Sequence, residues 1–311
     1  MMSKSMNRRF SDQLAQCECC PRKCGVNRLD GKMGFCRIGG DVLISYAGLH
    51  SGEEPPISGT RGSGTVFFAG CNLRCVFCQN HQISQDFRPD QMTVMTTDQL
   101  AAEMLRLAEA GAHNINLVSP SHVVFQAADA IVAARTRGLS IPIVYNSNGY
   151  DSVDALRQIR GLVDIYLPDI KYLSNDLGRR YSAATDYAQV VPDVLREMLD
   201  QVGHLEVDEN GIARRGLLVR HLVLPGHVDN SRRCLAFLSE LSGSIFISIM
   251  SQYSPQYRAS CCPEIDRPLS IREYEEVTDY ALSLGLENAF IQELNSRDRY
   301  LPDFDRDRPF E

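Results

Sequence analysis

The sequence lacks any apolar run close to the roughly 18 residues that a membrane-spanning helix needs. Residues 1–10 are polar and basic, without the apolar stretch of a signal peptide. Basic residues are also in the minority, and a net charge of −7 gives no electrostatic attraction to nucleic acid. We therefore expect a cytoplasmic protein that has neither a membrane nor a nucleic acid as a partner.

Long low-complexity segments are absent as well, and 44% of the residues are hydrophobic, which is ordinary for a chain with a packed core. A length of 311 residues suits one large α/β domain with an appendage. Residues 1–60 contain five cysteines and few apolar runs, so we predict a small Cys-rich metal-binding module there. We predict the main domain over residues 61–290 and a C-terminal extension over 291–311.

Short apolar runs alternate with helical patterns from residue 64 onward. The runs have the length and composition of buried strands, and they cover residues 65–69, 114–118, 141–145, 163–167, 217–224 and 245–250. Two of the helices between them begin with capping boxes, Thr96 with Gln99 and Ser270 with Glu273. This alternation predicts an α/β fold with a parallel sheet covered by helices. Six such units suit a partial (β/α)6 TIM-type barrel.

The eleven cysteines fall into groups. In a chain without an export signal, grouped cysteines are typical of metal ligands or catalytic thiols rather than of disulfides. Cys71, Cys75 and Cys78 follow the first predicted strand with the spacing C-x3-C-x2-C. Three thiolates on one loop can hold a [4Fe–4S] cluster, which usually takes four, and one iron then stays open for a substrate or cofactor. Zinc is the alternative, but a structural zinc ion would need a fourth ligand nearby.

This loop, with Phe77 just before its last cysteine, resembles that of the radical SAM superfamily, in particular its members similar to pyruvate formate-lyase activating enzyme. The resemblance extends over nearly the whole chain, and the matching stretches are CPRKCGVNR (20–28), GCNLRCVFCQN (70–80), NLVSPSH (116–122), VDIYLPDIK (163–171), VRHLVLPG (219–226), SQY (251–253) and QE (292–293). It implies that the open iron binds S-adenosylmethionine, and that an electron from the cluster releases a 5′-deoxyadenosyl radical. Cys71, Cys75 and Cys78 would then be the catalytic ligands. An electron donor of the flavodoxin or ferredoxin type is implied too, with a glycyl-radical enzyme as a candidate protein substrate.

Polar residues at the ends of successive strands should face one cavity, because the carboxyl ends of the strands meet at one end of a barrel. With the resemblance, this position implies cofactor binding by Phe77, Ser119, Ser121, Asn148, Asp169, Lys171 and Arg220. Lys171 and Arg220 can donate charge-assisted hydrogen bonds to an anionic group, which Asp169 would help to position.

One motif of the activating enzymes is replaced in this chain. They carry a Gly-Gly-Glu-Pro run at the turn after the second strand, where this chain has residues 119–122, SPSH. Residues 52–55, GEEP, look similar but precede the first predicted strand. We interpret residues 52–55 as a turn that joins the N-terminal module to the barrel, without a cofactor role.

A second metal site is predicted near the N-terminus. Cys17, Cys20, Cys24 and Cys36 have the spacing C-x2-C-x3-C-x11-C and leave Cys19 spare. Four thiolates satisfy either a closed zinc site or a second iron–sulfur cluster, and the spacing does not distinguish them. Unliganded thiols in a mobile N-terminus are the remaining alternative.

Three functions are compatible with these patterns. The chain could abstract hydrogen from a glycine of a partner enzyme, or act as a radical SAM enzyme on a small molecule or another target. A metal-bound scaffold without turnover is the third, and it would consume no S-adenosylmethionine.

Overall fold

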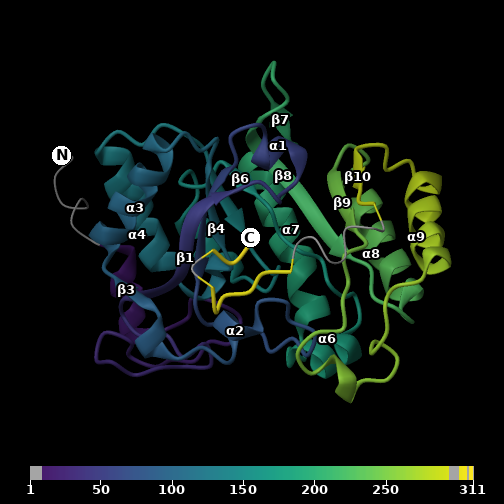
Figure 1. Cartoon of the computed structure of the whole chain (residues 1–311), viewed down its shortest axis with the longest axis horizontal. Coiled ribbons are helices and arrows are strands. Elements are labelled where there is room, and N and C mark those ends of the chain that lie inside the picture. The colour runs from purple at the N-terminus through teal and green to yellow at the C-terminus, as the bar shows by residue number, and fades with distance from the viewer. Residues whose placement is uncertain (1–8, 294–300, 307, 311) are drawn as a thin grey trace.

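The computed structural model describes residues 9–293, 301–306 and 308–310, and one curved sheet forms its centre (Figure 1). The strand order is β10-β9-β8-β6-β5-β4-β2-β1-β3. The parallel strands are β2 (Ser63–Phe68), β4 (Ile115–Val118), β5 (Ile143–Asn146), β6 (Ile165–Tyr166), β8 (Ala213–Leu222), β9 (Phe246–Met250) and β10 (Ala289–Ile291). Every predicted run overlaps one of these strands. The predicted α/β fold with a partial (β/α)6-type barrel is confirmed.

Helices follow the strands and cover the outer face of the sheet. They are α3 (Thr97–Glu109), α4 (Val124–Thr136), α5 (Val153–Gln158), α6 (Asn175–Ser182), α7 (Tyr187–Val202), α8 (Val228–Leu241) and α9 (Ile271–Ser283), with shorter turns α1 (Pro55–Ser58) and α2 (His81–Ser84). Both predicted capping boxes are present, at Thr96 with Gln99 and at Ser270 with Glu273. Buried apolar side chains fill the space between sheet and helices and form the core.

Two further strands extend the sheet beyond its parallel part. β1 (Val42–His50) pairs antiparallel with β2 and with β3 (Thr93–Met95). β1 belongs to the segment predicted as a separate module, so the expected boundary at residue 60 divides two paired strands. The interpretation of residues 52–55 as a link between a module and the barrel is therefore corrected, since they connect neighbouring strands of one sheet. The expected boundary at residue 290 falls inside β10.

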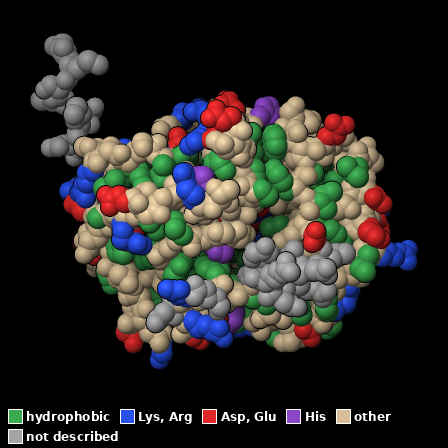
Figure 2. All heavy atoms as spheres, turned by 45° about the horizontal axis from the view of Figure 1, so that its top comes forward, with side chains coloured by type: hydrophobic (Ala, Val, Ile, Leu, Met, Phe, Trp, Pro, Cys, Tyr) green, Lys and Arg blue, Asp and Glu red, His purple; other side chains and the backbone are tan. Residues whose placement is uncertain are grey.

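Smaller elements complete the described chain. β7 (Glu206–Val207) forms a hairpin with β8, and four 3-10 turns are η1 (Phe10–Gln16), η2 (Pro89–Gln91), η3 (Pro120–His122) and η4 (Ala259–Cys261). Near the C-terminus, Phe304 and Phe310 pack against Phe67 of β2. None of the helices in the described ranges has the length and apolar character required to cross a bilayer. On the face shown in Figure 2, acidic and basic side chains are interspersed over the surface.

Candidate active site

A cavity of about 790 Å³ lies inside the curved sheet. Residues at the ends of several parallel strands line it. Its volume is within the usual range for ligand-binding pockets. Cys71, Cys75 and Cys78 line it from the loop after β2, together with Phe77 of the same loop. The segments after β4, β5 and β6 contribute Ser119, Asn148, Asp169 and Lys171, and β8 contributes Arg220. The topology therefore brings these residues, which are far apart in sequence, to one cavity.

The cysteine loop is positioned by its backbone. Gly70 turns the chain out of β2 with φ +77°, and a Cβ there would come within 2.6 Å of a backbone oxygen. Farther along, the amides of Arg74 and Val76 donate to the carbonyls of Ser182 and Tyr181, at 3.0 and 2.8 Å. The loop is thus attached to the end of α6.

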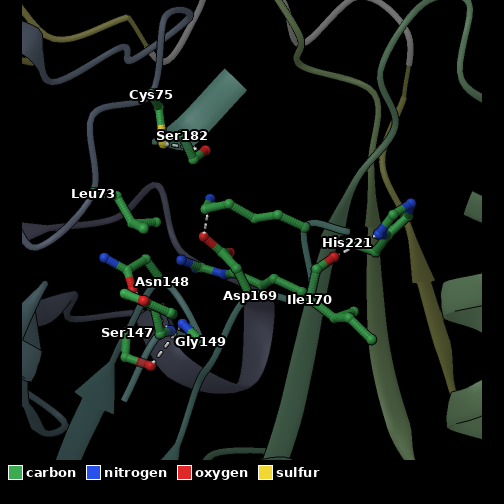
Figure 3. Close-up of polar contacts among 12 residues, drawn as sticks. Leu73, Cys75, Ser147, Asn148, Gly149, Asp169, Ile170, Ser182 and His221 are labelled. Carbon is green, nitrogen blue, oxygen red and sulfur yellow. Dashed lines mark hydrogen bonds and ion pairs between the residues drawn. The ribbon is translucent and has the colours of Figure 1, made fainter. Parts of the chain in front are cut away.

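Each of the three thiols has a polar neighbour. Cys71 Sγ accepts hydrogen bonds from the Leu73 amide at 3.3 Å and from Asn148 Nδ2 at 3.4 Å. Cys75 Sγ lies 3.0 Å from Ser182 Oγ, as Figure 3 shows. The third thiol, Cys78, is 3.2 Å from the hydroxyl of Ser84. Asn148, predicted to contact the cofactor, thus supports a cysteine of the loop.

The three cysteines fit a [4Fe–4S] cluster. Burial raises the pKa of Cys71 to about 11 and that of Cys78 to about 12, and it raises the pKa of Cys75 as well. Each is therefore a protonated thiol at neutral pH unless a metal displaces the proton. No further cysteine of the described residues lines this cavity. A four-iron cluster here would have three protein thiolates, which leaves one iron facing the cavity.

Phe77 forms part of the wall beside the cysteines. It is 6% exposed and packs edge-on against Tyr253 and Tyr181, with ring centroids 5.8 and 6.5 Å apart. These contacts hold the loop on its apolar side.

Lys171 and Asp169 form a buried ion pair at the cavity, drawn as a dashed line beside Asp169 in Figure 3. Lys171 Nζ lies 2.5 Å from Asp169 Oδ2, and the side chains are 15% and 21% exposed. Burial would lower the pKa of Lys171, but the charge of Asp169 outweighs it and holds this pKa above its usual range. Lys171 is therefore a cation at any physiological pH.

The guanidinium donors of Arg220 bind protein partners that the sequence did not indicate. Its Nε donates to Glu54 Oε1 at 2.7 Å, and its Nη2 pairs with both Glu53 and Glu54. Glu53 also accepts from Asn116 Nδ2 at 2.9 Å, and both glutamates line the cavity. Sequence reasoning missed them because they lie 167 and 166 residues from Arg220. The available signal was an arginine inside an apolar strand, since a buried guanidinium requires a counter-charge.

The turn after β4 only partly matches its expected role. Ser119 lines the cavity and has a left-handed backbone, φ 59° and ψ 52°, which is uncommon for a residue other than glycine. Ser121 is fully buried, does not line the cavity, and lies beside Asp151 instead. The 3-10 turn of η3 directs its side chain into the core, so the structure does not bring Ser121 to the expected site.

The N-terminal cysteines gather elsewhere. Cys17, Cys20, Cys24 and Cys36, with Cys19, line a second, smaller cavity. The two cavities have no lining residue in common.

Comparison with known proteins agrees with this geometry. The family model for the radical SAM superfamily matches residues 65–233. Among relatives from Methanocaldococcus jannaschii, the uncharacterized protein MJ0674 is 30% identical over 278 residues, which cover 87% of this chain and 75% of the relative. A second one, MJ0808, is 25% identical over 301 residues, or 91% of this chain and 82% of the relative.

Solved structures of the same fold include Streptococcus suis SuiB. Its complex with the precursor peptide SuiA has a TM-score of 0.52 at 13% identity and covers 75% of this chain and 49% of that chain. SuiB without that peptide gives a TM-score of 0.50 at 13% identity, over 74% and 49%. The chain thus spans about half the length of the solved structures, and the likeness concerns the fold alone. The family match over more than half of its length shows that this chain belongs to the radical SAM superfamily.

Proposed function

We propose that this chain cleaves S-adenosylmethionine reductively at a [4Fe–4S] cluster held by Cys71, Cys75 and Cys78. The observation that carries the proposal is the convergence of these three thiols, without a fourth from the described chain, on one large cavity. When bound, the cluster and S-adenosylmethionine together supply a 5′-deoxyadenosyl radical that abstracts a hydrogen atom. The electron comes from a donor protein of the flavodoxin or ferredoxin type.

The charge of the cavity supports S-adenosylmethionine as its occupant. The charged side chains of its described lining are Asp169, Glu53 and Glu54 against Lys171 and Arg220, which leaves one negative charge in excess. S-adenosylmethionine carries one positive charge in excess, because its sulfonium and ammonium groups outnumber its carboxylate. The electrostatic field of the cavity therefore attracts the molecule.

Two residues next to the cluster loop have suitable chemistry for the amino acid part of the cofactor. The charge of Lys171 lowers the pKa of Cys75 and the charge of Asp169 raises it, so both side chains lie close to this thiol. We expect Lys171 to donate to the carboxylate, and Asp169 to accept from the ammonium group. Arg220 has less to offer, because its donors already bind Glu53, Glu54 and Asn146.

For the target, the resemblance of the cluster loop to that of activating enzymes supports a glycine of a partner enzyme. Pyruvate formate-lyase with α-deuterated glycine is a direct probe. Anaerobic incubation with the reduced chain and S-adenosylmethionine should move deuterium into 5′-deoxyadenosine and produce a glycyl radical signal in electron paramagnetic resonance. Cys78→Ala serves as the control, and it should show neither. If 5′-deoxyadenosine forms without deuterium and without the signal, the activating role on this enzyme is wrong.

A small molecule is the second candidate target, and the pair Glu53 and Glu54 favours it. Two buried carboxylates share the single cation of Arg220, so this part of the cavity lining retains one negative charge. A substrate with an ammonium group would be attracted there. Glu53→Gln should then weaken turnover of such a substrate while the chain still forms 5′-deoxyadenosine. An unchanged KM for the substrate in Glu53→Gln would exclude a role for this carboxylate.

A further inference from the structure

Five cysteines of one irregular segment surround a cavity apart from the active site. Between η1 and β1 the chain has neither helix nor strand, and its turns are closed by backbone hydrogen bonds such as Cys17 N to the Val26 carbonyl at 3.0 Å. The side chains that line this cavity include Cys17, Cys19, Cys20, Cys24 and Cys36. All of them are free thiols, and four are buried. A segment that buries thiols in place of an apolar core is typical of a domain organised by a metal.

A buried arginine shows that this cavity needs negative charge. Arg28 is 1% exposed, and among the described residues none of its hydrogen bonds goes to a carboxylate. Its Nη1 lies 3.7 Å from both Cys17 Sγ and Cys19 Sγ and donates to the His122 carbonyl at 2.7 Å. Its Nε donates to the Gly39 carbonyl, and its Nη2 has no partner. A buried guanidinium requires a negative partner, and thiolates of this pocket, whose nearest sulfurs lie 3.7 Å from Nη1, would supply that charge.

We propose that this pocket holds a second iron–sulfur cluster, with Cys17, Cys20, Cys24 and Cys36 as ligands and Arg28 as the counter-cation. With four thiolates from the protein, the site is closed and cannot bind S-adenosylmethionine. Cys19 is the fifth cysteine and stays unliganded beside Arg28. The C-x2-C spacing of Cys17 and Cys20 suits two ligands of one cluster better than the adjacent pair Cys19 and Cys20 does.

The position of the pocket favours a cluster over a zinc ion. Four thiolates satisfy either of them. Zinc has no redox chemistry, whereas a cluster can pass an electron to the first site. The two sites are close, because Asn72 lines this pocket and its Oδ1 lies 3.8 Å from Cys71 Sγ.

Local contacts around Cys24 fit a ligand as well. The Phe35 amide donates to Cys24 Sγ at 3.4 Å, as backbone amides do at iron–sulfur centres. Gly34 leaves room for this thiol, because a Cβ at residue 34 would lie 2.7 Å from it. A side chain at residue 34 would therefore displace the sulfur.

The second site lies directly behind the loop of the first. Asn72 lines the five-cysteine cavity, and its Oδ1 lies 3.8 Å from Cys71 Sγ. Arg22 Nε donates to the Asn72 carbonyl at 2.9 Å, and Arg74 Nη2 donates to the Phe35 carbonyl. Both guanidinium groups also stack on the Phe35 ring, at 3.9 and 4.2 Å. Folding of residues 17–36 around a metal therefore also supports the loop that carries Cys71.

Metal analysis of the whole chain, purified and reconstituted without oxygen, tests the proposal. The wild type should contain about eight iron and eight sulfide ions per chain, as expected for two four-iron clusters. Replacing Cys71, Cys75 and Cys78 by alanine together should leave about four of each, with the absorption of an intact cluster. Adding Cys20→Ala and Cys24→Ala to that variant should remove the rest. About four irons in the wild type and none in the triple variant would overturn the proposal, as would a stoichiometric zinc ion.

Single variants test the ligand set independently. Cys20→Ala and Cys24→Ala should each lower the iron content by about half, while S-adenosylmethionine still binds to the cluster at Cys71. Cys234→Ala is the matched control, because Cys234 is a fully buried thiol outside both cavities. Cys19→Ala should likewise keep the wild-type iron content. If Cys19→Ala loses half of the iron and Cys17→Ala does not, the assignment of Cys17 as a ligand is wrong.

Discussion

Replacing Arg220 by methionine removes the cation that pairs with Glu53 and Glu54. The arginine side chain is 14% exposed and each glutamate 7%. Removal of one partner from a buried ion pair costs about 3–5 kcal/mol, because the remaining charge is left without compensation. For a domain of this size each kcal/mol corresponds to roughly 2–4 °C in Tm. We therefore expect the Tm of Arg220→Met to fall by on the order of 10 °C at pH 7.

The stability of Arg220→Met should also depend on pH in the opposite direction from that of the wild type. In the wild type, burial would raise the pKa of Glu54, but Arg220 outweighs it and lowers this pKa. The stability from Glu54 is thus present above the unfolded pKa of about 4.3, and it is lost as the pH falls through the folded pKa. In Arg220→Met both lowering effects of Arg220 are gone, and burial, the largest influence, opposes only the hydrogen bonds from the Glu54 backbone and from Ser248. We therefore expect the pKa of Glu54 in the variant to lie above its unfolded value. The variant should therefore gain stability on going from pH 7 to pH 5.

Thermal unfolding followed by circular dichroism, without oxygen and at equal iron content, measures both effects. Arg137→Met is the matched control, because Arg137 pairs with Asp98 on the surface, where the side chains are 43% and 69% exposed. Such a pair contributes about 0–1 kcal/mol. An Arg220→Met variant that melts within about 2 °C of the wild type would refute the reasoning, because the ion pair would then contribute only about 1 kcal/mol or less to the free energy of unfolding.

Three further variants test the site and the core. Cys78→Ala should lose the cluster of the active site, because two thiolates are too few to hold it; S-adenosylmethionine cleavage at the wild-type rate would contradict the ligand assignment. Lys171→Met should keep its iron but raise the Kd for S-adenosylmethionine by about one to two decades, since a charge-assisted hydrogen bond contributes about 1.5–3 kcal/mol; equilibrium dialysis measures it, and an unchanged Kd removes Lys171 from the site. Burial lowers the pKa of His221 to about 4, and its Nδ1 donates to the Ile170 carbonyl at 2.7 Å. The unfolded chain therefore takes up a proton below about pH 6.5 and the folded chain does not, so stability should fall from pH 6.5 toward pH 4. His221→Asn should flatten this slope in urea unfolding, and identical slopes would contradict the prediction.

The parallel part of the sheet was predictable from the sequence because its strands are buried on both faces. Such strands are nearly continuous apolar runs, and β4 and β5 are buried along their whole length. β1 was not predicted, because only Val42 and Ile44 are buried and its other residues are half-exposed or exposed. β10 has three residues, none of them buried, so no periodicity marks it. Edge strands thus lack the apolar signal that identifies the central ones.

The candidate site shows the same division between local and distant information. The loop with Cys71, Cys75 and Cys78 was predictable because its spacing alone indicates a cluster. The strand-end residues followed from the topology. The partners of Arg220 did not, since nothing near Glu53 and Glu54 in sequence points to a strand more than 160 residues away. Ser121 was misplaced because the direction of a side chain in a short 3-10 turn depends on dihedral angles that the sequence does not give.

Formation of 5′-deoxyadenosine tests the central claim most directly. The reconstituted chain is reduced without oxygen, mixed with S-adenosylmethionine and analysed by liquid chromatography, with Cys78→Ala treated in parallel. We predict that the wild type releases 5′-deoxyadenosine and methionine in equal amounts and that the variant releases neither. A wild-type chain that holds its four-iron cluster at Cys71, Cys75 and Cys78 but forms no 5′-deoxyadenosine would contradict the account.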